Sequence, residues 1–456
     1  MHRNVRNVAR PFRDPRHFLR RVRYSRAPDR SALLAPSATA LPAGRLFFPL
    51  DQRLQLGVEG YSPALLRRIV SQGARYSFAE ARQNLDELCG IQISAQHILR
   101  LTERTGGDWE KQRDAECADF LQNKLPRLYA QAPQVASAML DGGRARTREE
   151  PSGPGVLNPE WHEPKYGCFQ TLDSKCSDVD PQPEVPSKFL DKRRAPKLVE
   201  QIKSVRGTGA QRESPGATKT ARRKKPRKRP SRRIMRTVIA TMSGVDEFGL
   251  QVAAEVYKRG LDLAERKACV CDGQASNWTV WERHLKPLGF VAILDFIHLL
   301  SYIYGAAQAA GGSLDGRWKR YVKWLTWAWQ GRRDKLLVAL NGAVATAGQA
   351  PAEASESDPR VVLEKARNYI ANNSDKMDYP RYRKLGLPIS SAPVESVIKQ
   401  FNRRVKGTEK FWRKSALEKV LQVRAAQLSE DGRTERLWAT PRPSRAANHR
   451  PLRAAA

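Results

Sequence analysis

The sequence predicts an α/β protein in which an α/β core follows an all-α N-terminal region. Short buried strands and amphipathic helices alternate through the middle of the chain, in the order three strands, helix, strand, helix, strand. Three helical stretches precede this pattern, and a long Trp-rich helical stretch follows it. With 456 residues, the chain is long enough for two or three structural units.

Each predicted strand is a short apolar run, and three of the runs are followed directly by an aspartate. The strands are expected at 135–140, 166–172, 234–241, 267–271 and 290–294. Asp141, Asp272 and Asp295 follow the first, fourth and fifth of these runs. Apolar residues from Val245 to Val256 recur at helical spacing and predict the helix after the third strand. This order is typical of an RNase H-like domain, although order alone does not establish a function.

The helical N-terminal region contains a pair of helices with clear boundary signals. Ser77 and Ser94 are typical helix caps, and Gly90 is a typical helix end. The two helices that meet near Gly90 resemble a helix-turn-helix, in which the second helix enters a DNA major groove. Arg100 and Arg104 of that helix are then the expected DNA contacts. An ordinary helical hairpin is the alternative.

Composition divides the chain into segments of different character. The predicted parts are a disordered basic arm (1–45), a helical DNA-binding region (46–130), the first part of the α/β core (131–298), a helical insertion (299–385), a core helix (386–428) and a disordered basic tail (429–456). Residues 174–233 interrupt the core and are predicted to be a basic disordered insertion, because they are rich in Pro, Ser, Lys and Arg. The crowded tryptophans between residues 318 and 329 are expected to fill a core rather than to stack on bases.

The charge of the chain favours a polyanionic partner. There are 81 Lys and Arg residues against 47 Asp and Glu residues, which gives a net charge of +34. Neutralising nucleic-acid phosphates with such residues releases condensed counterions. No apolar run approaches the length of a membrane span, so nucleic acid is preferred over a membrane surface. The six cysteines show no zinc-site or disulfide spacing and are expected to be reduced core thiols in a cytoplasmic protein.

Three acidic residues on separate elements suggest a metal-dependent phosphodiester site. Carboxylates are the ligands that Mg²⁺ prefers, and two divalent ions can activate an attacking oxygen and stabilise a leaving oxygen. Asp141 and Asp272 each end a predicted strand, and Glu395 lies in a later amphipathic helix. On that helix Glu395, Lys399 and Lys406 share one face. Each acid also has a structural alternative, because Asp-Gly is a common turn and Glu suits the first turn of a helix.

Several motifs together resemble the signatures of bacterial DDE transposases. They are Asp141-Gly-Gly-Arg144, Cys271-Asp-Gly273, Ile293-Leu-Asp-Phe-Ile-His298, the segment 386–396 that ends in Pro393-Val-Glu-Ser396, and Arg403-Arg-Val-Lys-Gly407. Their order and spacing, from about residue 50 to about residue 425, are similar to insertion-sequence transposases distantly related to the Mutator-like group.

This resemblance implies an RNase H-like core with a helical insertion before the Glu-bearing helix. It implies a catalytic triad of Asp141, Asp272 and Glu395 that binds Mg²⁺ or Mn²⁺. Asp295 is a rival for the second ligand, and His298 is an auxiliary residue that contacts DNA or orients a carboxylate. The expected DNA contacts on the Glu-bearing helix are Lys399, Arg403, Arg404 and Lys406.

The expected partners and location follow from the same resemblance. The partners are terminal inverted repeats and target DNA, with a homo-oligomer in the synaptic complex, in the nucleoid of a bacterial cytoplasm. Residues Ser390–Pro393 depart from the Gly-Ser-Gly that relatives usually have before this helix. Two alternatives therefore stay open: a catalytically inactive, transposase-derived DNA-binding protein, and a structure-specific nuclease.

Overall fold

The computed structural model describes residues 39–41, 45–47, 60–129, 131–148, 160–206, 231–407 and 410–439. The chain forms two compact units, one of residues 66–439 and one of residues 1–65 with 440–456. In the latter, the strands β1 (Thr39–Leu41) and β2 (Arg45–Phe47) pair antiparallel within the predicted basic arm and just after it. The rest of that arm, the basic residues 221–230 and the last seventeen residues of the predicted tail (440–456) lie outside the described residues.

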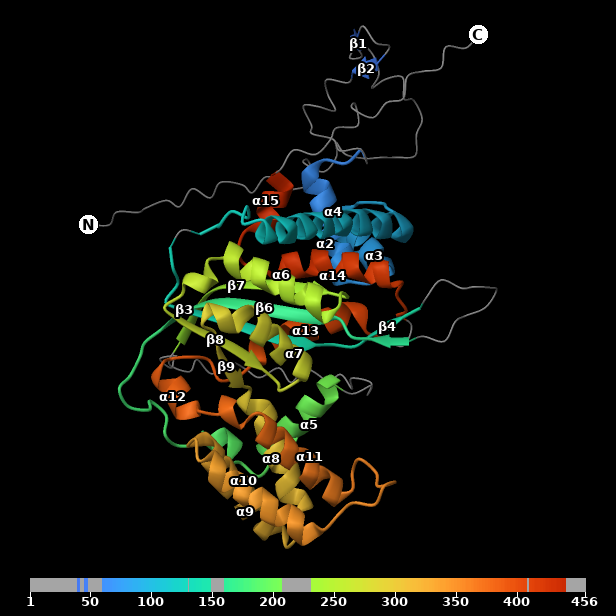
Figure 1. Cartoon of the computed structure of the whole chain (residues 1–456). Helices are drawn as coiled ribbons and strands as arrows, with labels where there is room; N and C mark the ends of the chain where they lie inside the picture. The colour runs from blue at the N-terminus through green and yellow to red at the C-terminus, as the bar shows by residue number, and fades with distance from the viewer. Residues whose placement is uncertain are drawn as a thin grey trace, which may run out of the picture. The chain divides into compact units, whose positions relative to one another are not determined.

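A five-stranded mixed sheet lies within residues 66–439 (Figure 1). Its strands are β3 (Val135–Gly142), β6 (Lys165–Ser174), β7 (Ser231–Thr241), β8 (Arg266–Cys271) and β9 (Val291–Leu294). The spatial order is β7-β6-β3-β8-β9, with antiparallel pairing from β7 to β3 and parallel pairing from β3 to β9. The predicted α/β class is therefore confirmed, and each predicted strand corresponds to one of these.

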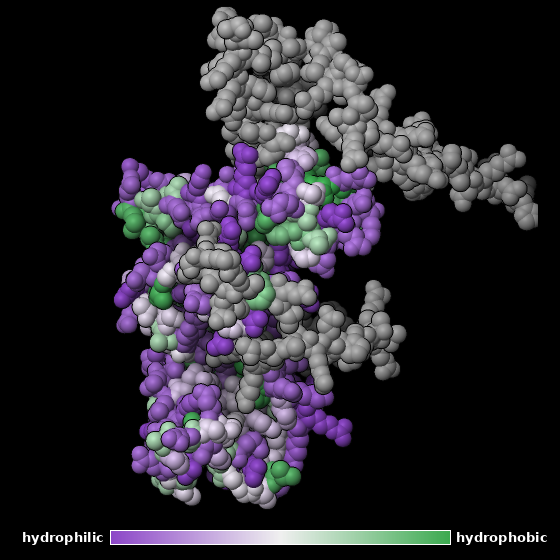
Figure 2. Space-filling view, turned by 90° about the vertical axis from the view of Figure 1, so that its right-hand side faces the viewer, coloured by the Kyte–Doolittle hydropathy of each residue, from purple (hydrophilic) through white to green (hydrophobic). Residues whose placement is uncertain are grey.

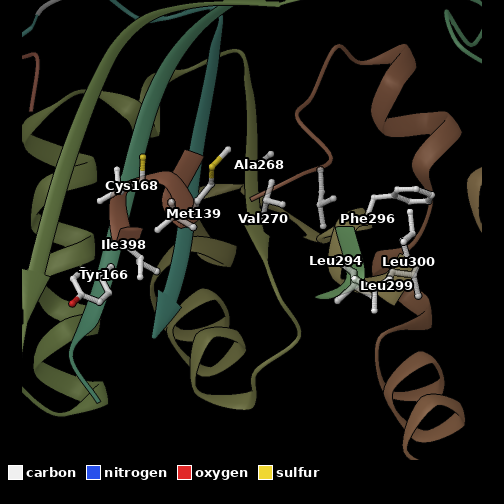
Figure 3. Close-up of a cluster of buried hydrophobic side chains, with 14 of the residues drawn as sticks. Met139, Tyr166, Cys168, Ala268, Val270, Leu294, Phe296, Leu299, Leu300 and Ile398 are labelled. Carbon is white, nitrogen blue, oxygen red and sulfur yellow. The ribbon is translucent and has the colours of Figure 1, made fainter. Parts of the chain in front are cut away.

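Helices cover both faces of the sheet, and the two faces bury alternate residues of each strand. The covering helices are α6 (Val245–Lys258), α7 (Ala275–Val280), α13 (Ala392–Val405) and α14 (Lys414–Leu428). On one face, Leu140 belongs to a buried cluster with Val252 of α6. On the other face, Met139 belongs to a buried cluster with Ile398 of α13 (Figure 3). The face that contains Met139 is also the face on which Asp141 should project, two residues along β3.

The N-terminal helices begin at the predicted start signals, and the second ends at the predicted Gly90, whereas the third continues well beyond the expected end near residue 108. They are α2 (Pro63–Arg75), α3 (Phe78–Cys89) and α4 (Ala95–Leu121). Ser77 and Glu80 form a reciprocal capping box at the start of α3, and Gly90 ends that helix at φ 63°. The Ser94 side chain caps α4 by accepting a hydrogen bond from the backbone of His97.

Helix α4 is much longer than a recognition helix needs to be, at 27 residues. It crosses α14 at Gly106, where a Cβ atom would lie 2.2 Å from the backbone oxygen of Lys419. Further along, Cys117 of α4 is buried with Ala254 of α6. One side of α4 is therefore packed against the α/β core (Figure 1), which is the packing expected of a structural helix.

The predicted helical insertion consists of five helices. They are α8 (Phe296–Ala309), α9 (Leu314–Trp329), α10 (Arg333–Ala347), α11 (Pro359–Asn372) and α12 (Tyr379–Lys384). Trp324 and Trp329 are 4% and 3% exposed, and the Trp329 ring meets Phe296 edge to face at 4.8 Å. The expectation that these tryptophans fill a core is confirmed.

Residues 174–206 differ from the predicted disordered insertion. Phe189 is buried, and its ring centre lies 5.9 Å from that of Phe296. The Trp329 indole donates a hydrogen bond to the backbone oxygen of Gln182, and Asp180 forms an ion pair with Arg383. The prediction of disorder is therefore wrong for residues 174–206. It was based on the average composition of the insertion, in which the few residues that pack against the helical insertion carry little weight.

The remaining elements are short. They are β4 (Ala145–Thr147), β5 (Glu160–His162), α5 (Arg194–Arg206), α15 (Arg433–Ala439), the 3-10 helices η2 (Ser187–Phe189), η3 (Leu261–Leu263), η5 (Lys286–Leu288) and η6 (Ser374–Lys376), and the π-helical turn η4 (Trp281–Leu285). Helix α15 lies in the predicted disordered tail, so that prediction is wrong for residues 433–439.

Cys269 and Cys271 are buried as expected, whereas Cys89 and Cys176 are exposed free thiols. Within the described part of the chain, no helix is long and apolar enough to cross a membrane.

Candidate active site

Asp141 lies at the end of β3, next to Gly142, where the regular pairing with β6 ends. Its carboxylate accepts a hydrogen bond of 2.8 Å from the backbone of Gly142. A Cβ atom on Gly142 would lie 2.1 Å from a carboxylate oxygen of Glu163. Because only glycine leaves that space, the Asp-Gly sequence brings a second carboxylate close to the end of β3.

A cavity of about 200 Å³ lies beside the end of β3. Its lining residues are Asp141, Gly142, Gly143, Arg144, Glu163, Ile202, Gln274, His298 and Glu395. Three carboxylates thus face one small space, beside a single arginine and a histidine. Gln274 holds Glu163 in place by donating a hydrogen bond of 3.1 Å from its side-chain amide.

Glu395 reaches the cavity from the first turn of α13. The predicted apolar stripe of this helix is confirmed, since Val394 and Phe401 are both fully buried. Burial of that stripe fixes the rotation of the helix, and the Glu395 side chain is left 14% exposed at the cavity. A carboxylate oxygen of Glu395 lies 3.8 Å from Nδ1 of His298.

Asp295 is buried and serves as the N-cap of α8. One of its carboxylate oxygens accepts hydrogen bonds from the backbones of Ile297 and Ser391, each at 3.2 Å. The other accepts from the backbone of His298 at 3.2 Å and contacts Nδ1 of its ring at 2.5 Å. Burial raises the pKa of Asp295, but the contact with His298 and the backbone donors outweigh it and lower the pKa. Asp295 therefore orients His298 and ties the start of α13 to the start of α8.

Asp272 follows β8 beside Asp141. The last paired residues of the two parallel strands are Leu140 and Cys271, so the two aspartates occupy the next positions of the register. Asp272 is 2% exposed, and one carboxylate oxygen accepts hydrogen bonds from the backbone of Gln274 and the side chain of Asn277. Asp272 is not among the residues that line the cavity.

The structure places the two rival second ligands differently. Asp295, His298 and Glu395 form a group whose potential ligand atoms lie within 4.8 Å of one another. Asp272 is next to Asp141 in the sheet but bonds to the turn that follows β8. Of the predicted triad, Asp141 and Glu395 face the same cavity.

The four predicted DNA contacts of α13 have unequal access to solvent. Lys399 and Arg403 are exposed, and Lys406 is half-buried. Burial is the main cause that lowers the pKa of Lys406, and the positive charge of Arg144 lowers it further. Arg404 is 2% exposed, so it does not present its charge to solvent in this structure.

The buried Arg404 has a structural environment instead. Its guanidinium donates a hydrogen bond to the backbone oxygen of Gly73 and lies over the rings of Phe78 and Trp412, at 4.5 and 4.8 Å. Burial lowers its pKa to about 10. Arg404 therefore joins the end of α13 to helices α2 and α3.

The other predicted DNA contacts, Arg100 and Arg104, are exposed on α4. They lie in a hollow that also contains Glu103, Asp108 and Lys419. Their surroundings are thus of mixed charge rather than purely basic.

The meeting of Glu163, Arg144 and Gln274 at the cavity is not evident from the sequence. No motif in the sequence distinguishes Glu163 from the other acidic residues of this stretch. It is placed by pairing of β4 with β5, which sets Arg146 opposite Trp161. Strands of three residues carry too little periodic pattern to be predicted. The local signal is Gly142, since a glycine after a strand-ending aspartate permits close approach of another chain segment.

The residues that line the cavity have the chemistry of a site for a small cation or for a group that carries one. Its carboxylates offer oxygen ligands, and Arg144 offers a fork of donors suited to phosphate. No protein-family model matches the sequence, and no curated protein matches it either. The function therefore has to be inferred from the site itself.

Proposed function

We propose that this protein is a metal-dependent enzyme that cleaves DNA at the ends of an insertion sequence and joins those ends to target DNA, as DDE transposases do. The observation that carries the proposal is the shared cavity of Asp141 and Glu395. One comes from the end of a sheet strand and the other from a helix that follows a long helical region. Such convergence of carboxylates from separate elements is a typical arrangement for phosphodiester chemistry.

The order of the strands supports an RNase H-like core. Three antiparallel strands are followed by two parallel ones, and the central strand β3 carries Asp141. Helix α13 packs on the face of the sheet to which Met139 belongs. Helices α8 to α12 correspond in position to the helical insertion that the resemblance implies.

The residues at the cavity fit a hard divalent cation such as Mg²⁺ or Mn²⁺. Asp141 and Glu395 would hold it, with Asp272 or Asp295 as the second ligand and Glu163 lining the same cavity, because carboxylate oxygens are suited to these ions. When bound, such ions activate an attacking oxygen and stabilise a leaving oxygen. His298, held by Asp295, would position Glu395 and restrict its rotation. Arg144 would bind a phosphate oxygen at the edge of the cavity.

Charge and exposure support DNA as the substrate. The net charge of +34 favours a polyanion, and Lys399 and Arg403 project from α13 into solvent. Hydrophilic residues cover most of the described surface on the face shown in Figure 2. We expect terminal inverted repeats and target DNA as partners, a homo-oligomer in the synaptic complex, and a place in the nucleoid of a bacterial cytoplasm.

The hydrogen bonds of Asp272 favour a second candidate function. Its carboxylate is bonded to Gln274 and Asn277 within its own turn. If this arrangement does not change when DNA binds, the acid cannot complete a triad. The chain is then a transposase-derived protein that binds DNA ends without cutting them.

The test is cleavage of a labelled duplex that carries the DNA flanking the coding region. Wild type is compared with Asp141→Asn, Asp272→Asn, Asp295→Asn and Glu395→Gln, with Mg²⁺ or with EDTA. Asp315→Asn is the matched control, because Asp315 is an exposed acid on α9 that is absent from the cavity lining.

The proposal expects metal-dependent nicking by wild type and by Asp315→Asn. It expects binding without nicking by Asp141→Asn and Glu395→Gln. Loss of nicking in Asp272→Asn but not in Asp295→Asn assigns the second ligand to Asp272, and the reverse assigns it to Asp295. Binding by wild type without nicking in either metal supports the second candidate.

A further inference from the structure

The β4–β5 hairpin carries exposed aromatic rings stacked with an arginine. Arg146 and Trp161 are paired across the two strands, and the Arg146 guanidinium carbon lies 4.9 Å from the Trp161 ring centre. The ring of Phe411 lies 5.8 Å from the same carbon. Trp161 is 43% exposed and Phe411 is 37% exposed. We call Arg146, Trp161 and Phe411 the hairpin surface.

The hairpin surface continues directly from the cavity. Arg144 and Glu163 line the cavity and lie two residues from Arg146 and Trp161, respectively. Arg144 and Glu163 lie just outside β4 and β5, but these strands keep the register of β3 and β6, so residues two apart along this extended stretch are expected on the same face, about 7 Å from one another. Ala145 is buried, as expected for the opposite face. A row of arginines therefore leads from the cavity to the exposed rings.

This surface is held rigidly to the rest of the protein. The backbone of Trp412 donates to the oxygen of Arg146 at 3.1 Å, and the backbone of Arg148 donates to the oxygen of Trp412 at 2.8 Å. The Trp412 indole donates to the backbone oxygen of Val405 at the end of α13. The hairpin surface and the helix that carries Glu395 are thus joined by hydrogen bonds. Figure 1 shows β4 and α13 at the same end of the sheet.

We propose that the hairpin surface binds an unpaired nucleotide of a DNA strand, with the base stacked on Trp161 and the backbone beside the arginines. Large exposed rings next to cationic side chains are suited to stacking with bases of any sequence. The positive charge of Arg144, Arg146 and Arg148 is complementary to a strand that enters the cavity. This inference rests on the proposed function, because it specifies that the DNA bound beside the cavity is single-stranded. Paired bases stack on each other, so a fully paired duplex cannot offer the same contact.

The test measures binding in EDTA at one fixed salt concentration, by fluorescence anisotropy. The probes are a short labelled oligothymidylate strand and a blunt duplex of the same length. The proteins are wild type, Trp161→Leu, Trp161→Phe and Arg146→Lys. Tyr76→Leu is the matched control, because Tyr76 is 42% exposed and lies at the end of α2, outside the cavity lining.

Trp161→Leu should weaken binding of the single strand roughly ten-fold or more, while binding of the duplex stays within about two-fold of wild type. Trp161→Phe should retain most of the affinity, Arg146→Lys should lose part of it, and Tyr76→Leu should bind like wild type. Equal single-strand binding by Trp161→Leu and wild type would overturn the inference. So would an equal loss for strand and duplex, or a change of oligomeric state without a change in DNA binding. Because metal is absent, this result is independent of whether the protein cleaves DNA.

Discussion

Two regions of this protein gather acidic side chains, and they do so in different ways. Near the start of α15, the buried Glu255 and Asp431 both bond to Arg433, at 2.5 and 2.7 Å. Lys258 adds a second cation, 3.4 Å from Glu255. At the end of β3, by contrast, three carboxylates and one arginine line a cavity of about 200 Å³.

Under the proposed function, this difference distinguishes acids that stabilise the fold from acids that bind a ligand. Around Arg433, each buried carboxylate has a cation in direct contact, so burial is balanced within the protein. At the cavity, the negative charges face a common space that is open to a ligand. A charged ligand such as a divalent cation would balance them there. We therefore expect mutations at the cavity to lower activity without lowering stability. We expect mutations around Arg433 to lower stability without lowering the activity of the folded protein.

The largest effect is expected at the cavity. Asp141→Asn or Glu395→Gln should lower the rate of metal-dependent DNA cleavage by at least ~10³-fold, because each removes a charge on which the chemistry depends. The free energy of unfolding without metal should not fall, since one of several clustered like charges is removed. Cleavage assays and urea unfolding measure the two quantities. A variant that unfolds more easily than wild type would place these acids with the structural group.

Arg433→Met should have the reverse effect. It leaves Glu255 and Asp431 buried without their shared cation, which should cost about 3–5 kcal/mol in the free energy of unfolding. Urea unfolding gives this value, and cleavage per folded molecule should be unchanged. Arg67→Ala is the control. Its ion pair with Glu435 is largely exposed and should contribute less than about 1 kcal/mol.

The Arg433 cluster should also make stability depend on pH. Burial raises the pKa of Asp431, but the charge and hydrogen bonds of Arg433 outweigh it and lower the pKa to about 2. A carboxylate with a lowered pKa in the folded state stabilises the fold above its unfolded pKa, near 3.8. About 2 kcal/mol should therefore be lost as the pH falls from about 4 to about 2. Urea unfolding of Arg433→Met over this range should show a much smaller dependence, and an unchanged one would contradict the assignment.

The smallest expected effects distinguish two adjacent arginines of α13. Arg403→Ala should weaken binding to any duplex several-fold and leave stability unchanged, because Arg403 is exposed. Arg404→Met should leave DNA binding of the folded protein unchanged but cost about 1–3 kcal/mol of stability, because it removes the donor to Gly73. Anisotropy at fixed salt and urea unfolding separate the two. Equal loss of binding in both variants would show that Arg404 reaches DNA.

The sequence was informative wherever a periodic pattern decided the structure. The apolar runs located the five sheet strands, and the stripe from Val394 to Val405 fixed which face of α13 carries Glu395. Serine and glycine caps located α3 and α4. These features depend on local geometry and burial, which a single sequence reveals.

The remaining features depend on contacts between distant residues. Nothing local indicates that Arg404 is buried beneath Phe78 while its neighbour is exposed. Nothing local places Glu163 over Gly142, or brings the backbone of Ser391 to the carboxylate of Asp295. Such placements follow from how the elements pack, and they decide which acids face the cavity.

The most direct test of the cavity as a cation site is calorimetric titration with Mn²⁺. Wild type, the double variant Asp141→Asn/Glu395→Gln, and Asp315→Asn are compared in the same buffer. We expect wild type and Asp315→Asn to bind the ion alike, and the double variant to bind it at least about ten-fold more weakly. Equal binding by the double variant, or no binding by wild type, would contradict the claim that these acids gather to hold a divalent cation.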